Sequence, residues 1–230
     1  MPNGPFSLPA ELYLLAWDTK AIKLTRTASL HLLVRAGALT ELAQRGRLVD
    51  VDGIVTPADD SRTGDPVLDG LLELIEESRP RTWKAWVSRD AGLTLGAVRD
   101  QLRGTGHLRT ETRRVLGLFP AKDHVLDQGG GVAAADALKT GVLGVLRGTQ
   151  DVSEVPERAA ALVALAAAGE LRTVITAADA AAYEERVAVL TQRAGAAAPA
   201  LRKVLEEVRA ALVVAILTAA IVPPITAGGS

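Results

Sequence analysis

Apolar side chains recur every three or four positions along most of this chain, which is the spacing of amphipathic helices. The segment TGDPVLDGLLELIEESRP shows the pattern clearly, because Asp65 stands at an N-cap, Pro66 suits the first helical position and Pro80 ends the run. The same spacing predicts a first helix that begins near Ser7 and a short helix that carries Trp83 and Trp86 on one face. It predicts further helices over residues 29–44, 93–103, 131–147, 155–168, 177–194 and 200–222.

Two segments alternate in the manner of β-hairpins. RLVDVDGIVT alternates around Asp52-Gly53, a dipeptide that favours a two-residue turn. GHLRTETRRVLGLFPAKD, residues 106–123, has one basic arm and one arm containing VLGLFP. This second hairpin is open to three interpretations: the wing of a DNA-binding fold, an apolar tip that enters a lipid surface, or a ribbon lying over a core.

These elements together predict the fold class. We expect a mainly α protein, one compact helical domain over residues 1–230 with one or two short β-hairpins. Residues 1–8 and 223–230 are expected to be flexible ends. The longest apolar run, 13 residues from Ala210 to Val222, is shorter than the roughly 20 residues needed to span a bilayer, so it predicts a buried core helix.

The charge is uneven along the chain, although the net charge is only −1. Residues 79–114 contain nine Arg and Lys against three Asp and Glu, which leaves the remaining residues with a net charge of −7. Such a segment is either a solvated basic face or a surface that binds anions. Because arginines here are followed by LGLF, an anionic membrane interface is favoured over DNA, whose phosphates call for polar wing tips.

Catalytic constellations are hard to find. The three histidines, His31, His107 and His124, lack the spacing of metal ligands. The run DQGGG precedes a helix but has no phosphate-loop lysine, so it predicts a plain connection. Asp65 and Asp69 are four residues apart, but Asp65 is better explained as a helix cap. We therefore expect no enzyme and no cofactor.

The compartment follows from two further features. The chain has no cysteine, which fits a reducing cytosol. The first residues have no basic segment followed by an apolar core and a cleavage site, so no secretory signal is predicted. We expect a cytoplasmic protein that is peripheral on the inner face of the cell membrane.

Several motifs in combination resemble the Golgi phosphoprotein 3-like family, including its bacterial members. The resemblance runs from about Leu8 to Val222. It is carried by LYLLAWD, LTELAQRGRL, TGDPVLDGLLE, QLRGTGHLRTE, LFP and ERAAALVALAAA. It implies a helical fold around a central four-helix core, with an exposed hairpin that engages membranes. It also implies a basic pocket for the headgroup of phosphatidylinositol 4-phosphate.

The family's pocket of one aromatic residue and three arginines maps onto this chain only in part. One arginine matches Arg35, the aromatic position holds Arg26, and the other two arginine positions hold Gly92 and Leu95. Replacement charge would come from neighbouring arginines. The predicted headgroup ligands are thus Arg35, Arg26, Arg89, Arg99 and Arg103, and the predicted membrane-contacting residues are Leu116, Leu118 and Phe119.

Three functional hypotheses follow. The first is a peripheral membrane protein that binds anionic phospholipid, by resemblance phosphatidylinositol 4-phosphate, with no nucleic-acid partner. The second is a winged-helix-like nucleic-acid-binding protein, since a helix precedes the basic ribbon. The third is a cytosolic adaptor for a protein partner.

Overall fold

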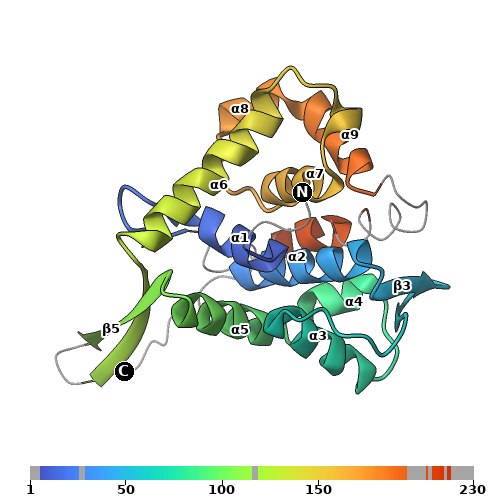
Figure 1. The fold of residues 1–230 in the computed structure, drawn as a ribbon, viewed down its shortest axis with the longest axis horizontal. Helices are drawn as coiled ribbons and strands as arrows, with labels where there is room; N and C mark the ends of the chain where they lie inside the picture. The colour runs from blue at the N-terminus through green and yellow to red at the C-terminus, as the bar shows by residue number, and fades with distance from the viewer. Residues whose placement is uncertain are drawn as a thin grey trace, which may run out of the picture.

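The computed structural model describes residues 6–25, 29–115, 119–195, 206, 209–214 and 217–218, and the side chains of residues 112–122 lie outside this description. The protein is mainly helical, as the sequence predicted, with three two-stranded antiparallel hairpins among these residues. Two layers of helices enclose a central pair, α1 (Leu8–Leu15) and α2 (Leu30–Gln44) (Figure 1).

The central pair is buried on all sides. Every residue of α1 is buried, and in α2 only His31 and Gln44 are not. A helix that is apolar all round is stable only inside a protein, which explains the weak amphipathic pattern of these two segments. The helices cross closely at Gly37, where a Cβ would lie 2.6 Å from Leu12 Cδ1 and 3.3 Å from the Pro9 backbone.

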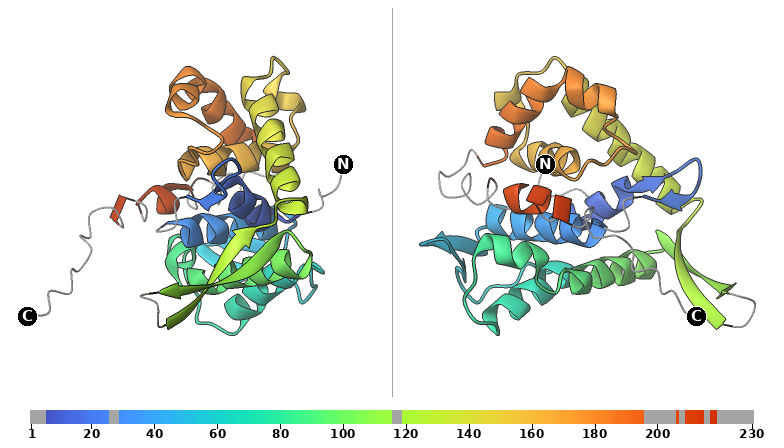
Figure 2. Two further views of the ribbon diagram at one scale, coloured as in Figure 1. Left: turned by 90° about the vertical axis from the view of Figure 1, so that its left-hand side faces the viewer. Right: turned by 180° about the vertical axis from the view of Figure 1, so that it is seen from behind.

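One layer contains α3 (Pro66–Glu76), α4 (Trp83–Ser88) and α5 (Ala91–Gly104). The other contains α6 (Gly130–Arg147), α7 (Glu157–Ala168), α8 (Ala177–Ala182) and α9 (Glu184–Arg193), and Figure 2 shows the two layers from the side and from behind. The start of α3 is capped as the sequence predicted, since Asp65 accepts hydrogen bonds from the amides of Val67 and Leu68.

The hairpins connect the helices. The first, β1 (Trp17–Asp18) with β2 (Lys23–Leu24), is not among the predicted elements, because two-residue strands leave no period in the sequence. The second, β3 (Leu48–Val51) with β4 (Ile54–Pro57), turns at Asp52-Gly53 as predicted, and both turn residues have positive φ. The third pairs β5 (Leu108–Val115) with β6 (Phe119–Leu126).

Several helix boundaries differ from the prediction. The segment 177–194 forms two helices, α8 and α9, because the backbone of Tyr183 leaves the helical region at φ −117° and ψ 22°. Periodicity cannot separate one helix from two that share a buried face. A 3₁₀ turn, Val152–Glu154, precedes α7, which therefore begins two residues later than predicted.

The two chain ends also differ from a simple sequence prediction. Ser7 occupies the N-cap position of α1, but its side chain makes no cap, and the carboxylate of Glu41 accepts the hydrogen bond from the Leu8 amide instead. Leu8, at the limit of the expected flexible end, is fully buried. Of the predicted helix 200–222, residues 206, 209–214 and 217–218 are described, and they are helical. Ala211 and Leu212 are buried, but Val213, Val214 and Leu217 are exposed, so the prediction of a buried core helix is wrong for these three residues. No described helix combines the length and apolar character that a bilayer crossing needs.

Candidate functional site

The third hairpin extends from one end of the helical body (Figures 1 and 2). Its root is fixed, because the paired residues Leu108 and Leu126 are both buried in the core. Gly106, at φ +79°, makes the turn out of α5 into β5. The hairpin is therefore firmly attached to the body, and its first residues lie beside the C-terminal end of α5.

Two of the predicted arginines lie near this root. Arg99 and Arg103 are one turn apart on α5, so they share a face of the helix. Arg103 forms an ion pair with Asp100 at 2.9 Å, and half of its side chain is exposed. Arg99 makes no ion pair with any residue that the structure describes. Its guanidinium carbon lies 5.8 Å from the ring centroid of Tyr13 in α1, which is a cation–π arrangement.

The pKa shifts of neighbouring groups report the positive charge of this site. Burial lowers the pKa of His124 in β6, and the charges of Arg99 and Arg103 lower it further, while the charges of Asp100 and Asp123 oppose that shift. Burial raises the pKa of Tyr13, and the charge of Arg99 opposes that shift. His124 Nδ1 and Arg99 Nε are both buried without a hydrogen-bond partner among the described residues. We call Tyr13, Arg99, Arg103 and His124 the hairpin-root site.

A third arginine near this site, Arg109, has carboxylate partners. Arg109 in β5 lies 3.5 Å from a carboxylate oxygen of Asp127 and 3.9 Å from one of Glu111. The carboxylate of Asp127 also accepts hydrogen bonds from the amides of Gly129 and Gly130 at the start of α6. The glycine run is thus a connection into a helix, as predicted, and an aspartate already occupies the amides that a phosphate would use.

Arg35 has a different environment. It has no exposed surface, and burial lowers its pKa to about 10. Its guanidinium donates to Thr94 Oγ1 at 2.8 Å and to two backbone carbonyls, those of Asp90 at 2.8 Å and Trp86 at 3.5 Å. The residue thereby joins α2 to α4 and α5 through neutral acceptors, and it makes no ion pair with a described carboxylate. It also lines a cavity of about 290 Å³ between α3 and α5.

Of the remaining predicted ligands, Arg89 is next in the chain to Asp90, whose carbonyl accepts a hydrogen bond from Arg35. Arg89 is exposed, ends α4 and pairs with Asp90 at 2.7 Å, at the opposite end of α5 from Arg103. Arg26, Leu116 and Leu118 lie outside the described residues, and Phe119 begins β6 with its side chain outside the description. The structure therefore brings Arg99 and Arg103 together and leaves Arg35 and Arg89 separate from them.

Two members of the hairpin-root site were missed by sequence reasoning. Tyr13 lies in an apolar segment that predicted only core, and His124 was interpreted as an isolated polar residue. Each is far from Arg99 in the chain. They come together only because α1 and β5 pack against α5 and β6 pairs with β5. The two tryptophans of α4, by contrast, are both buried, and Trp83 donates from its indole to Asp50 at 2.8 Å.

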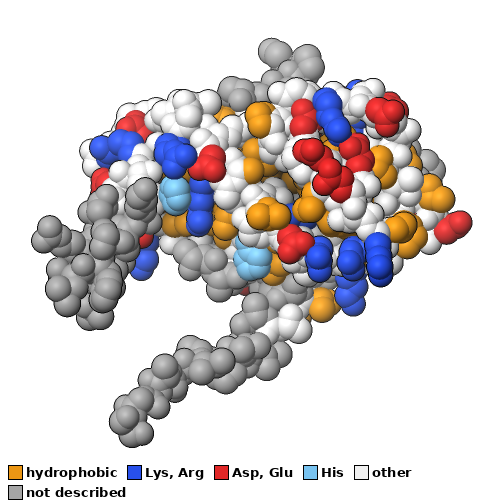
Figure 3. Space-filling view, turned by 90° about the horizontal axis from the view of Figure 1, so that it is seen from below, with side chains coloured by type: hydrophobic (Ala, Val, Ile, Leu, Met, Phe, Trp, Pro, Cys, Tyr) orange, Lys and Arg blue, Asp and Glu red, His pale blue; other side chains and the backbone are white. Residues whose placement is uncertain are grey.

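The surface around α3, α5 and the hairpin is not uniformly charged. Figure 3 shows basic side chains beside the hairpin, with acidic side chains among them, and basic side chains along one edge, while the largest group of acidic side chains lies on the part of this face farther from the hairpin. Apolar side chains separate these groups. No group of three or more potential metal-ligating side chains occurs among the described residues. The arrangement is suited to holding an anion near the hairpin rather than across the whole face.

Comparison with known proteins agrees with this architecture. Residues 8–208 match the family of Golgi phosphoprotein 3 (GPP34), which covers most of the chain. A comparison with curated proteins finds no match. The matched range includes the central helices, the hairpin and the hairpin-root site. This chain therefore belongs to the Golgi phosphoprotein 3 family.

Proposed function

We propose that this protein is a peripheral membrane protein that binds anionic phospholipid headgroups at the hairpin-root site. Phosphatidylinositol 4-phosphate, the lipid associated with the family, is the first candidate. The observation that carries the proposal is Arg99, a guanidinium without a described carboxylate partner, placed among Tyr13, Arg103 and His124 at the root of the hairpin. A phosphate would give Arg99 the anionic partner that it lacks among the described residues.

The hairpin gives the site its second component. Leu116, Leu118 and Phe119 lie at its far end in the sequence, and full burial of such side chains contributes about 1.5–3 kcal/mol each. Each arginine near an anionic surface contributes about 1 kcal/mol. Stable membrane attachment commonly needs two such signals together. Because the hairpin is anchored by Leu108 and Leu126, insertion of its tip would bring the hairpin-root site toward the headgroups.

Arg35 and Arg89 have supporting roles in this proposal. Arg35 holds α2 against the start of α5, and thereby positions the helix that carries Arg99 and Arg103. Arg89 is exposed and can add charge at the other end of the same helix. Direct contact of Arg35, Arg26 or Arg89 with a headgroup stays a prediction.

Flotation of the full chain with liposomes tests the proposal. Three compositions are compared: neutral vesicles, vesicles with phosphatidylglycerol, and vesicles with phosphatidylinositol 4-phosphate. Binding to the last alone indicates recognition of the phosphorylated headgroup, and equal binding to both anionic compositions indicates recognition of general negative charge. Absence of binding to every composition would contradict the proposal.

A tip variant separates insertion from charge. Changing Leu118 and Phe119 to Ser removes the apolar tip and leaves the arginines in place, so weaker flotation is expected with an unchanged circular dichroism spectrum. Unchanged flotation would exclude tip insertion. Salt-sensitive binding to duplex DNA by a protein that ignores vesicles would favour the winged-helix alternative.

A further inference from the structure

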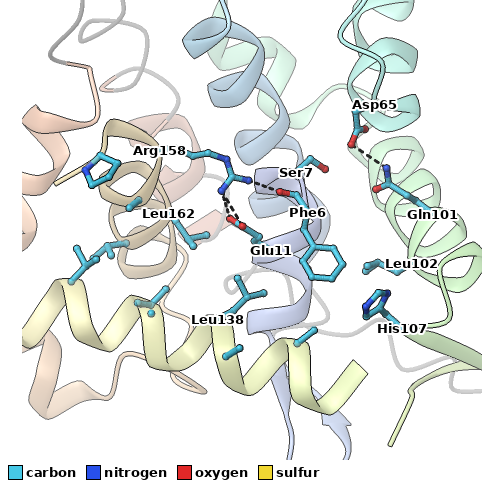
Figure 4. A pocket seen from close by; sticks show the side chains of 18 of the residues that line it. Phe6, Ser7, Glu11, Asp65, Gln101, Leu102, His107, Leu138, Arg158 and Leu162 are labelled. Atoms are coloured by element: carbon cyan, nitrogen blue, oxygen red, sulfur yellow. Dashed lines mark hydrogen bonds and ion pairs between the residues drawn. The ribbon is translucent and has the colours of Figure 1, made fainter. Parts of the chain in front are cut away.

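A second candidate site lies in a different part of the molecule. A cavity of about 760 Å³ lies between α1, α5, α6 and α7, and Figure 4 shows it from close by. None of the four residues of the hairpin-root site lines it. Cavities of this volume are typical of sites for small organic ligands.

The walls of the cavity are largely apolar, and several of the residues that form them are small. Leu162 and Val163 face it from α7, and Leu138, Gly141 and Val142 face it from α6. Figure 4 shows the side chains of α6 directed into the cavity. At Gly141, a Cβ would meet no atom within 4 Å, so the cavity there is wide enough for added carbon atoms.

Polar groups gather toward α1 and α5. Arg158 extends from α7 to Glu11, and its Nη1 lies 2.9 Å and 2.8 Å from the two carboxylate oxygens. Its other terminal nitrogen donates to the Phe6 carbonyl at 2.6 Å. On the opposite side, Gln101 donates to the carboxylate of Asp65 at 3.0 Å (Figure 4). The polar part of the cavity therefore contains two carboxylates and one guanidinium, each with at least one partner. It also contains His107, whose Nδ1 lies 3.0 Å from the hydroxyl of Thr105.

This charge distribution selects the type of ligand. A ligand with a carboxylate or phosphate group would be repelled by the carboxylates of Glu11 and Asp65. To pair with Arg158, it would have to displace Glu11. A cationic ligand would be repelled by Arg158. It would also find both carboxylates already accepting hydrogen bonds from protein donors. Burial of an unpaired charge is costly, whereas an uncharged head leaves these pairs intact.

Two groups in the lining lack partners. The hydroxyl of Ser7, a residue only 5 % exposed, makes no hydrogen bond with any described residue, and neither does Nε of Arg158. Buried polar groups are normally satisfied, so orphaned groups in a cavity wall indicate a place for a hydrogen-bonding ligand or water. An apolar wall with a few polar groups at one end is the usual design of a site for an amphiphile.

We propose that this cavity binds an uncharged amphiphile, a molecule with an apolar chain or ring system and a hydroxyl or amide head. The apolar part lies along α6 and α7, and the head lies toward Ser7, Arg158 and Gln101. This site is independent of the hairpin-root site and of the phospholipid-binding function proposed above.

A neutral fluorescent probe tests the proposal on the full chain. N-phenyl-1-naphthylamine brightens in apolar surroundings, so saturable fluorescence enhancement is expected. Displacement is then compared at pH 8 among 1-decanol, decanoate and decylamine, which share one chain and differ in head charge. We expect decanol to displace the probe at about tenfold lower concentration than either ion. Displacement that is most effective with an ion, or absence of probe binding, would overturn the proposal.

A matched pair of variants locates the site. Gly141 and Gly144 are both exposed interior glycines of α6 where an added Cβ would meet no atom within 4 Å, but only Gly141 lines the cavity. Gly141→Leu is expected to weaken probe binding about tenfold by filling the cavity, whereas Gly144→Leu leaves it unchanged. Equal probe binding by the two variants would show that the probe binds elsewhere. Retained vesicle flotation by Gly141→Leu would show that the two sites act separately.

Discussion

Arg35, at the centre of the molecule, and Arg99, at the hairpin root, have different environments, and the comparison shows that the surroundings of an arginine determine its role. Arg35, on α2, is fully buried and has three neutral acceptors, so its positive charge stabilises contacts between α2, α4 and α5. Arg99, on α5, lies on an aromatic ring beside another arginine and has no described carboxylate partner. The first environment is complete within the protein, whereas we expect an anion to complete the second.

The most severe test of this comparison is removal of Arg35. Arg35→Ala leaves a cavity and the acceptors of Thr94, Asp90 and Trp86 without their donor, so we expect a loss of about 3–5 kcal/mol in the free energy of unfolding. Urea denaturation measures this loss. Arg89→Ala, an exposed change near the same end of α5, is the control and should cost less than about 1 kcal/mol. Similar losses for both variants would remove the structural role assigned to Arg35.

The packing of the central pair gives the next largest effect. Gly37→Ala places a methyl group 2.6 Å from Leu12 Cδ1, so we expect destabilisation of about 1–3 kcal/mol. Gly70→Ala in α3 is the control, because a Cβ there meets no atom within 4 Å, and it should stabilise the protein by about 0.5–1 kcal/mol. Thermal unfolding of both variants checks the predicted opposite signs, and a stabilising Gly37→Ala would contradict the close helix crossing.

At the hairpin root, the expected effect is on binding rather than on stability. Since each arginine contributes about 1 kcal/mol near an anionic membrane, changing both Arg99 and Arg103 to Gln should weaken vesicle binding by roughly 30-fold. Arg172→Gln, an exposed change in the α7–α8 connection, should have little effect. Co-sedimentation with phosphatidylglycerol vesicles measures both. An equal loss in the Arg172 variant would point to net charge rather than to a site.

The smallest expected effect is a change in titration. The pKa of His124 is lowered, so the unfolded chain takes up its proton at a higher pH than the folded protein does. The contribution of this group to stability is therefore fully present above its ordinary pKa near 6.5 and decreases as the pH falls toward the lowered value. Arg99→Gln removes a cation and should raise the pKa of His124, as should binding of an anionic headgroup.

Nuclear magnetic resonance titration of the His124 ring measures these shifts. Arg172→Gln serves again as the control and should leave the pKa of His124 unchanged. A titration that is insensitive to both Arg99→Gln and a soluble inositol phosphate would separate His124 from the proposed headgroup site. In that case the arginines alone would remain as candidate ligands.

Much of the fold was determined by the sequence itself. Some features depend only on residues close together in the chain. Asp65 and Pro66 begin α3, Asp52-Gly53 makes a turn, and the spacing of the leucines in α3 identifies its buried face. The family motifs likewise predicted a helical body with a hairpin, which the structure and the family match bear out. Helix breaks such as Tyr183 escaped prediction because both flanking helices use the same buried face.

The candidate sites depended on tertiary structure. The sequence identified an arginine-rich segment, but it placed Arg35, Arg89, Arg99 and Arg103 in one group. Only the folded chain shows that Arg35 is enclosed by α4 and α5 while Arg99 meets Tyr13 and His124. The cavity lined by Gly141 and Arg158 is likewise a product of four helices that are distant in sequence. Charge is a property of a residue, but its partners and its burial are set by long-range packing.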